Sequence, residues 1–140
     1  MKQVFLGFGA VIVLAGVTAC GGPSSPEVVV PAANNTARDG AARQQMRIIY
    51  RAEEGYKSKN DRYGTIDELV DSGDLNVNPK NDRLFKYTLS ATKDTFQCVG
   101  MPVIYNTNGK TSLYIDQTGQ LRGADHQGGP ALASDPVITE

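Results

Sequence analysis

Apolar side chains recur with a helical period between residues 36 and 60. At about 100° per residue, the apolar positions that share one face are Ala41, Ile48, Ile49, Ala52 and Tyr56. The opposite face carries Arg43, Arg47, Glu54 and Lys57. Thr36, with Asp39 three residues later, forms an approximate capping box. The pattern therefore predicts a long amphipathic helix that begins at Thr36 and ends near Asn60.

A second, shorter helix is indicated directly after the first. Thr65 and Glu68 have the spacing of a capping box, so we expect this helix to begin at Thr65 and to end near Ser72 and Gly73. Its buried side would consist of Ile66, Leu69 and Val70. The charged face of the first helix is best interpreted as solvated, because Glu53 and Glu54 interrupt its positive charge.

From residue 84 onward the apolar period changes to two, which is typical of strands. The predicted strands are 84–89, 95–99, 112–115 and a final short one at 121–122. Turns are expected at 91–94, at 106–109, where Asn108-Gly109 is a strong hairpin signal, and at 117–120. The fold class is therefore α+β: one long N-terminal amphipathic helix and a short helix packed on a three- or four-stranded antiparallel sheet. After Ala124 we expect a loop along the surface.

The N-terminus has the layout of a secretory signal. Lys2 precedes an apolar run from Val4 to Val17, and small residues follow. The run is shorter than the roughly 20 residues of a transmembrane helix. We therefore divide the chain into a signal peptide (1–19), a tether (20–35) rich in Gly and Pro, and a folded domain (36–140).

Val17-Thr18-Ala19-Cys20 resembles a bacterial lipobox. The resemblance implies cleavage between Ala19 and Cys20, with a diacylglycerol thioether and an N-acyl chain such as palmitate on Cys20. Several acyl chains anchor a protein stably, whereas one does not. Gly21, rather than Asp, follows the cysteine and favours the outer membrane, facing the periplasm, with the inner membrane and the cell surface as alternatives. The alternative is an ordinary signal peptide cut after Ala19, which leaves Cys20 as a free thiol.

Three segments resemble the globular part of type IV pilins and of the major pseudopilins of type II secretion. They are 52–56 (Ala-Glu-x-x-Tyr), 63–69 (Tyr-Gly-Thr-Ile-Asp-Glu-Leu) and 112–122, which contains Tyr-Ile-Asp-x-x-Gly. The resemblance spans about 36–136 and implies a helix packed on a small antiparallel sheet. The chain departs from the family at its N-terminus. Gly7-Phe8 mimics the pilin cleavage site, but Ile12 stands where the family has Glu, and Gly21-Gly22-Pro23 would interrupt the polymerising helix.

Residues for catalysis or metal binding are scarce. The chain has one histidine, His126, which lies in the Gly-rich tail, where we expect it to be exposed. Two cysteines and one histidine are too few for a zinc site, and we expect no metal, no cofactor and no catalytic residue. Cys98 is interpreted as a buried apolar residue, with pairing to another chain as the alternative. Calcium is bound by some major pseudopilins; the candidates here are Asp116, Asp125 and Asp135.

These observations favour a non-enzymatic, lipid-anchored envelope protein with a structural or protein-binding role, as an accessory of a type IV pilus or type II secretion system. Its partners would be the membrane and another envelope protein. Nucleic acid is excluded as the main partner, because the formal net charge is −1 and provides no basic excess. Two alternatives stay open: a true filament subunit processed near Gly7, and a periplasmic module that binds calcium or a small ligand.

Overall fold

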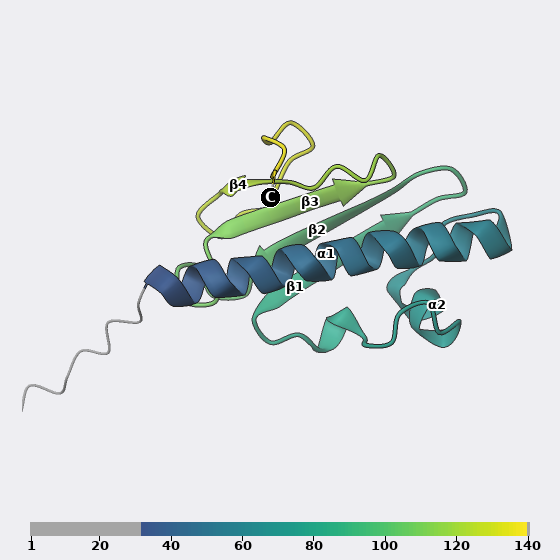
Figure 1. Ribbon diagram of the computed structural model, residues 1–140, viewed down its shortest axis with the longest axis horizontal. Coiled ribbons are helices and arrows are strands. Elements are labelled where there is room, and N and C mark those ends of the chain that lie inside the picture. Colours follow the sequence, from purple (N-terminus) through teal and green to yellow (C-terminus); the bar gives the residue numbers. More distant parts are fainter. Residues whose placement is uncertain (1–31, 140) are drawn as a thin grey trace, which may run out of the picture.

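The computed structural model describes residues 32–139. Its helices are α1 (Ala32–Asn60), α2 (Ile66–Asp71) and a single 3-10 turn, η1 (Pro79–Asn81). Its strands are β1 (Phe85–Ala91), β2 (Phe96–Pro102), β3 (Thr111–Asp116) and β4 (Arg122–Asp125). The predicted α+β class is confirmed, with one long helix, one short helix and a four-stranded antiparallel sheet (Figure 1).

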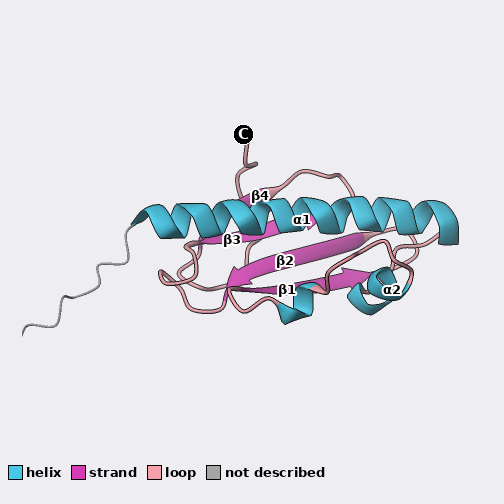
Figure 2. Cartoon of the chain, turned by 60° about the horizontal axis from the view of Figure 1, so that its bottom comes forward, coloured by secondary structure: helices cyan, strands magenta, loops and turns pink. Residues whose placement is uncertain are grey.

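The sheet is a meander in which each strand pairs with the next, in the order β1-β2-β3-β4. Cys98 in the centre of β2 lies opposite Leu89 of β1 on one side and opposite Ile115 of β3 on the other. These aligned positions point to the same face, because side chains alternate along a strand. Helix α1 runs across that face of the sheet, while α2 and η1 lie beside β1 (Figure 2).

The hydrophobic core lies between α1 and the sheet. On α1 the buried apolar residues are Ala42, Met46, Ile49, Ala52 and Tyr56. The sheet contributes Phe85, Tyr87, Phe96, Cys98, Leu113 and Ile115. Two aromatic contacts extend the core towards the C-terminal end of α1, with Phe96 packed against Tyr63 at 4.9 Å and against Tyr50 at 6.2 Å between ring centroids. Burial of this face, more than helix propensity, stabilises α1 in place.

The long helix differs from its sequence prediction in start and in orientation. It begins at Ala32, so the last residues of the predicted 20–35 tether are helical. Asp39 therefore does not cap the helix; it lies one to two turns inside it. Ala41 and Ile48 were expected to be buried but are exposed, whereas Ala42 and Met46 are buried. The buried face therefore runs through Ala42, Met46 and Ile49, and it is turned from the predicted face by less than one residue, because Ile49, Ala52 and Tyr56 belong to both.

The short helix α2 follows its prediction closely. Thr65 is the N-cap residue, its hydroxyl accepts a hydrogen bond from the Glu68 N–H, and the Glu68 carboxylate accepts one from the Thr65 N–H. The predicted capping box is therefore confirmed. Ile66 and Leu69 are buried as expected, and Val70 is partly buried.

The four predicted strands are confirmed, with ends that differ by one to three residues. The turn at 117–120 is also as expected, because Gly119 takes the left-handed conformation (φ +72°) and donates its N–H to the Asp116 carbonyl. The Asn108-Gly109 pair does not form a two-residue hairpin. It lies in a longer connection, residues 103–110, in which Asn106 has the positive φ.

The C-terminal tail returns along β4 and is held there by backbone hydrogen bonds. The Gly123 N–H donates to the Pro136 carbonyl (3.1 Å), and the Ile138 N–H donates to the Leu121 carbonyl (2.8 Å). The tail therefore covers the outer edge of β4. Within the described residues, no helix is both long and apolar enough to cross a membrane.

Candidate functional site

The predicted lipid-attachment residue, Cys20, and the cleavage point after Ala19 lie outside the residues that the structure describes. The Gly7 processing point of the alternative hypothesis lies outside them too. The features described below all belong to the folded domain.

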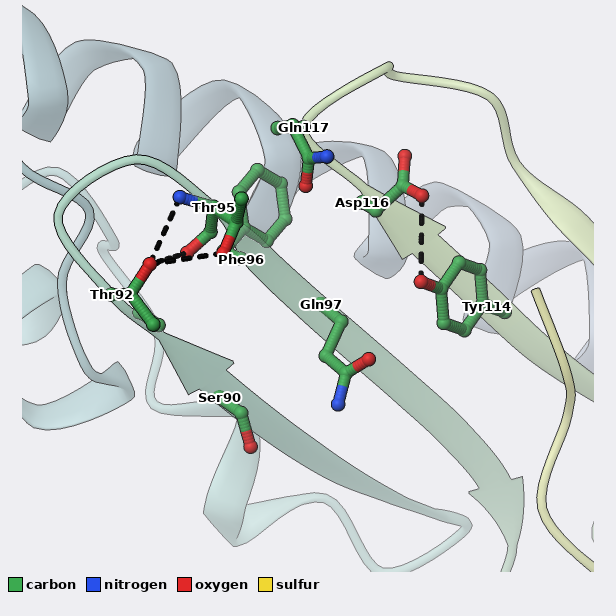
Figure 3. Close-up of a pocket in the computed structure, with 9 residues that line it drawn as sticks. Ser90, Thr92, Thr95, Phe96, Gln97, Tyr114, Asp116 and Gln117 are labelled. Carbon is green, nitrogen blue, oxygen red and sulfur yellow. Dashed lines mark hydrogen bonds between the residues drawn. The ribbon is translucent and has the colours of Figure 1, made fainter.

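A shallow pocket lies at the end of the sheet where the β1–β2 and β3–β4 turns meet (Figure 3). Its volume is about 390 Å³. The lining is mostly polar, with Ser90, Thr92, Thr95, Gln97, Tyr114, Asp116 and Gln117, and it is completed by Ala91 and by Phe96, whose ring packs into the core. These side chains come from strands β1, β2 and β3 and from the turns that connect them.

Hydrogen bonds inside the pocket occupy part of its polar groups. Thr92 and Thr95 close the β1–β2 turn through their hydroxyls, which lie 2.9 Å apart. The Tyr114 hydroxyl donates to Asp116, whose other carboxylate oxygen accepts from the N–H and hydroxyl of Thr118. The pocket could accept hydrogen bonds from a polar ligand, but Ser90 and the threonines have no imidazole beside them that would act as a general base.

Glu53 is a buried carboxyl group, so its interpretation as one of the solvated charges of the first helix is wrong. Its side chain is completely buried, and one carboxyl oxygen, Oε2, accepts a hydrogen bond from the Gly64 N–H at 2.9 Å. The other oxygen, Oε1, has no hydrogen-bond partner among the described residues. Burial raises the pKa of Glu53 from its ordinary 4.5 to about 7, although the Gly64 hydrogen bond acts in the opposite direction.

The loop that covers Glu53 is fixed by charged residues next to it. Arg62 donates hydrogen bonds to both carboxylate oxygens of Glu68 (2.5 and 3.2 Å) and to the Tyr56 hydroxyl (3.0 Å). The Arg62 guanidinium, followed by the Thr65 N–H, lowers the pKa of Glu68 to about 2. Since Glu68 also caps α2, this contact ties the start of α2 to the end of α1 and holds the Gly64 N–H over Glu53.

The sequence could have indicated the burial of Glu53 through its spacing. Ile49, Glu53 and Tyr56 are separated by four and three residues, which places all three on one helical face. What the sequence does not show is the partner, because the Gly64 N–H reaches Glu53 only through the loop geometry.

His126 was expected to be exposed, and this expectation is wrong, because its side chain is only 26% exposed. Its Nε2 lies 2.7 Å from a carboxylate oxygen of Asp135, which is itself buried and also accepts the Leu132 N–H. Although burial alone would raise the pKa of Asp135, the hydrogen bonds from Leu132 and His126 lower it below its usual value. The contact between His126 and Asp135 joins two parts of the C-terminal tail, so we interpret both residues as structural.

The three calcium candidates are not brought together. Asp116 accepts hydrogen bonds in the β3–β4 turn, Asp125 accepts them from the Gln127 N–H and the Tyr105 hydroxyl, and Asp135 binds His126. Among residues 32–139, no group of three or more His, Cys, Asp or Glu side chains is placed to hold a metal ion.

Cys98 is completely buried in the core, as expected. Its sulfur lies 3.8 Å from the Met46 sulfur, and burial raises the pKa of the thiol to about 12. A thiol that is buried and protonated is a poor nucleophile, so the interpretation of Cys98 as a packing residue is confirmed.

The β2–β3 connection, residues 103–110, holds the first turns of α1. Asn35 donates to the Asn106 carbonyl (3.0 Å), and Arg38 donates to the Thr107 carbonyl. Asp39 accepts from the Lys110 N–H (3.0 Å) and from the Thr111 hydroxyl (2.9 Å). Three large apolar side chains lie exposed beside this contact: Leu84 (40%), Val103 (55%) and Ile104 (56%).

Comparison with known proteins found no matching family model, no matching curated protein and no matching solved structure.

Proposed function

We propose that the protein is a lipid-anchored lipoprotein of the bacterial cell envelope whose folded head binds another envelope protein. The observation that carries the proposal is Val17-Thr18-Ala19-Cys20 directly after the apolar run that begins at Val4. A cysteine at that position, after small residues, is what lipidation requires. Two or more acyl chains on Cys20 would anchor the chain stably, whereas a single chain gives only reversible binding.

We further propose that the head is pilin-like. A long helix packed on a four-stranded antiparallel meander is compatible with the resemblance in segments 52–56, 63–69 and 112–122. The proposed role as an accessory of a type IV pilus or type II secretion system rests on this analogy of fold. Gly21-Gly22-Pro23 and Ile12 separate the chain from a subunit that polymerises through its N-terminal helix.

The described surface supports binding of a protein more than catalysis. The pocket of Figure 3 is shallow and polar and contains no nucleophile beside a base. The histidine and the cysteine of the head, His126 and Cys98, are engaged in the tail and in the core. Three of the exposed large apolar side chains, Leu84, Val103 and Ile104, lie near the N-terminal turns of α1, and a bound partner or another segment of the chain would bury them.

A Cys20→Ser variant tests the anchor. We expect the wild-type chain in the membrane fraction, resistant to extraction with high salt, and with labelled palmitate incorporated. The Cys20→Ser chain should incorporate no label, and Cys98→Ser, which removes the other cysteine, should keep it. Equal labelling of wild type and Cys20→Ser would contradict the proposal.

The partner is tested by chemical cross-linking in intact cells, followed by affinity purification of the anchored protein. Recovery of a pilus or secretion component is the expected result. Recovery of envelope proteins without any such component would refute the accessory role and leave the anchor untouched. Polymers of this chain with an N-terminus at Phe8 would favour the filament subunit instead.

A further inference from the structure

Three exposed apolar residues lie close to one another where β1 begins and β2 ends. The Val103 N–H donates to the Leu84 carbonyl at 2.9 Å, so these two residues lie side by side, and Ile104 follows Val103 directly. We call Leu84, Val103 and Ile104 the corner patch. Arg83, which precedes Leu84, is exposed and forms no ion pair with any of residues 32–139.

The chain enters the folded domain at this same corner. Asn35 binds Asn106, which is two residues beyond Ile104, and the N-terminal end of α1 lies at the end of the molecule that also holds the β2–β3 connection (Figure 1). The described part of the chain therefore begins at the end of the molecule that holds the corner patch. At about 3.3–3.6 Å per residue, Val30 can reach roughly 7 Å from Ala32, and Val28 roughly 13 Å.

The sequence of that segment is complementary to the surface in front of it. In the sequence, Ala32 is preceded by Pro31, then by Val30, Val29 and Val28, and then by the acidic Glu27. On the surface, Asn106 is followed by the apolar Ile104, then by Val103 paired with Leu84, and then by the basic Arg83. The order of apolar residues and then an acidic one in the segment therefore matches the order of apolar residues and then a basic one on the surface.

We propose that Val28–Val30 packs on the corner patch of its own chain, with Glu27 beside Arg83. The docked segment shields Leu84, Val103 and Ile104 from water. One consequence rests on the proposed function, because it requires the lipid anchor. If Cys20 is anchored, docking shortens the free tether to residues 21–26 and holds the N-terminal end of α1 towards the membrane. The surfaces at the C-terminal end of α1 and the pocket of Figure 3 then face away from the membrane.

Disulfide cross-linking tests the docking in the full chain that carries Cys20→Ser, so that the outcome does not depend on lipidation. Cys98 is buried and does not compete. Val29→Cys is combined with Val103→Cys or with Ile104→Cys, both at exposed positions where the substitution is tolerated. The matched control combines Val29→Cys with Asp94→Cys, which is exposed in the turn at the other end of β1 and β2.

We expect an intramolecular disulfide at position 103 or 104 with a yield at least about tenfold above the Asp94 control, since docking raises the effective concentration of the segment. Glu27→Arg should lower that yield, and adding Arg83→Glu should restore it. Equal yields at positions 103, 104 and 94, or disulfides only between two chains, would overturn the proposal. If the disulfide yield is the same with and without Glu27→Arg, the pairing of Glu27 with Arg83 is overturned.

Discussion

Replacing Glu53 by glutamine should make the protein more stable above neutral pH. Glu53 is completely buried, and only one of its carboxyl oxygens, Oε2, has a hydrogen-bond donor among the described residues, the Gly64 N–H. The glutamine side chain would keep a carbonyl oxygen for that donor and would remove the charge that burial disfavours. The substitution therefore isolates the free-energy cost of ionising a buried carboxyl group.

The magnitude follows from the pKa of Glu53, which burial raises from 4.5 to about 7. Between these two pH values the folded state keeps the proton that the unfolded state has lost. The free energy of unfolding therefore falls as the pH rises, and the fall levels off above pH 7. At about 1.4 kcal/mol per pH unit, the total loss is about 3 kcal/mol. This is a large part of the 5–15 kcal/mol that is typical of a folded domain.

The assay is urea unfolding followed by far-ultraviolet circular dichroism at a series of pH values from 4.5 to 8.5. We expect wild type and Glu53→Gln to be nearly equal at pH 4.5 and to differ by about 3 kcal/mol at pH 8.5 in favour of the variant. Glu54→Gln, which changes an exposed neighbour on the same helix, should keep most of the wild-type pH dependence and shift it slightly to lower pH, because the Glu54 charge helps to raise the pKa of Glu53. Glu68 does not interfere, since its pKa of about 2 places its effect at lower pH.

The reasoning is refuted if the difference between wild type and Glu53→Gln stays constant across this pH range. It is also refuted if the variant is the less stable protein at pH 8.5, because the Glu53 carboxylate would then be stabilised by a partner that the structure does not show.

Four further predictions concern capping, packing and burial. Thr65→Ala removes the N-cap of α2 and should lower the free energy of unfolding by about 0.5–2 kcal/mol, measured by urea unfolding. Gly109→Ala would place a Cβ atom 2.6 Å from Cζ of Phe85 and closer still to Asp39, and should cost about 1–3 kcal/mol; Gly40→Ala, in open space on α1, should instead stabilise by up to about 1 kcal/mol. A chromogenic thiol reagent should react with Cys98 only after unfolding, and rapid reaction in the native protein would contradict its burial.

The elements that the sequence predicts well are those set by local interactions. The Thr65–Glu68 capping box and the Gly119 turn depend on residues within a few positions of each other, and both form as expected. Strand positions follow from alternating burial against a single covering helix, as in β1, where Phe85 and Tyr87 are buried and Lys86 is exposed.

The features that the sequence does not predict depend on contacts between distant segments. The orientation of α1 is decided by Met46, which packs against Cys98, and not by Ile48, although either would give an apolar face. Gly109 is required because Asp39 and Phe85 lie against it, and not because of a tight turn. The binding of His126 to Asp135 forms only when the tail closes.

The proposed lipid anchor rests on the N-terminal sequence, and the proposed pilin-like role rests on the resemblance of three segments of the folded domain. The structure adds two testable features to this picture, the buried Glu53 and the corner patch beside the start of α1. Both can be examined in a chain without lipid, so their outcomes are independent of the anchor.

The most direct test of the central claim is the intact mass of the protein extracted from membranes, with and without inhibition of signal peptidase II. We predict a chain that begins at Cys20 and carries the mass of a diacylglycerol and an N-acyl group, and an uncleaved chain when the peptidase is inhibited. A chain that begins at Phe8, or one that begins at Cys20 with no added mass, would contradict the account.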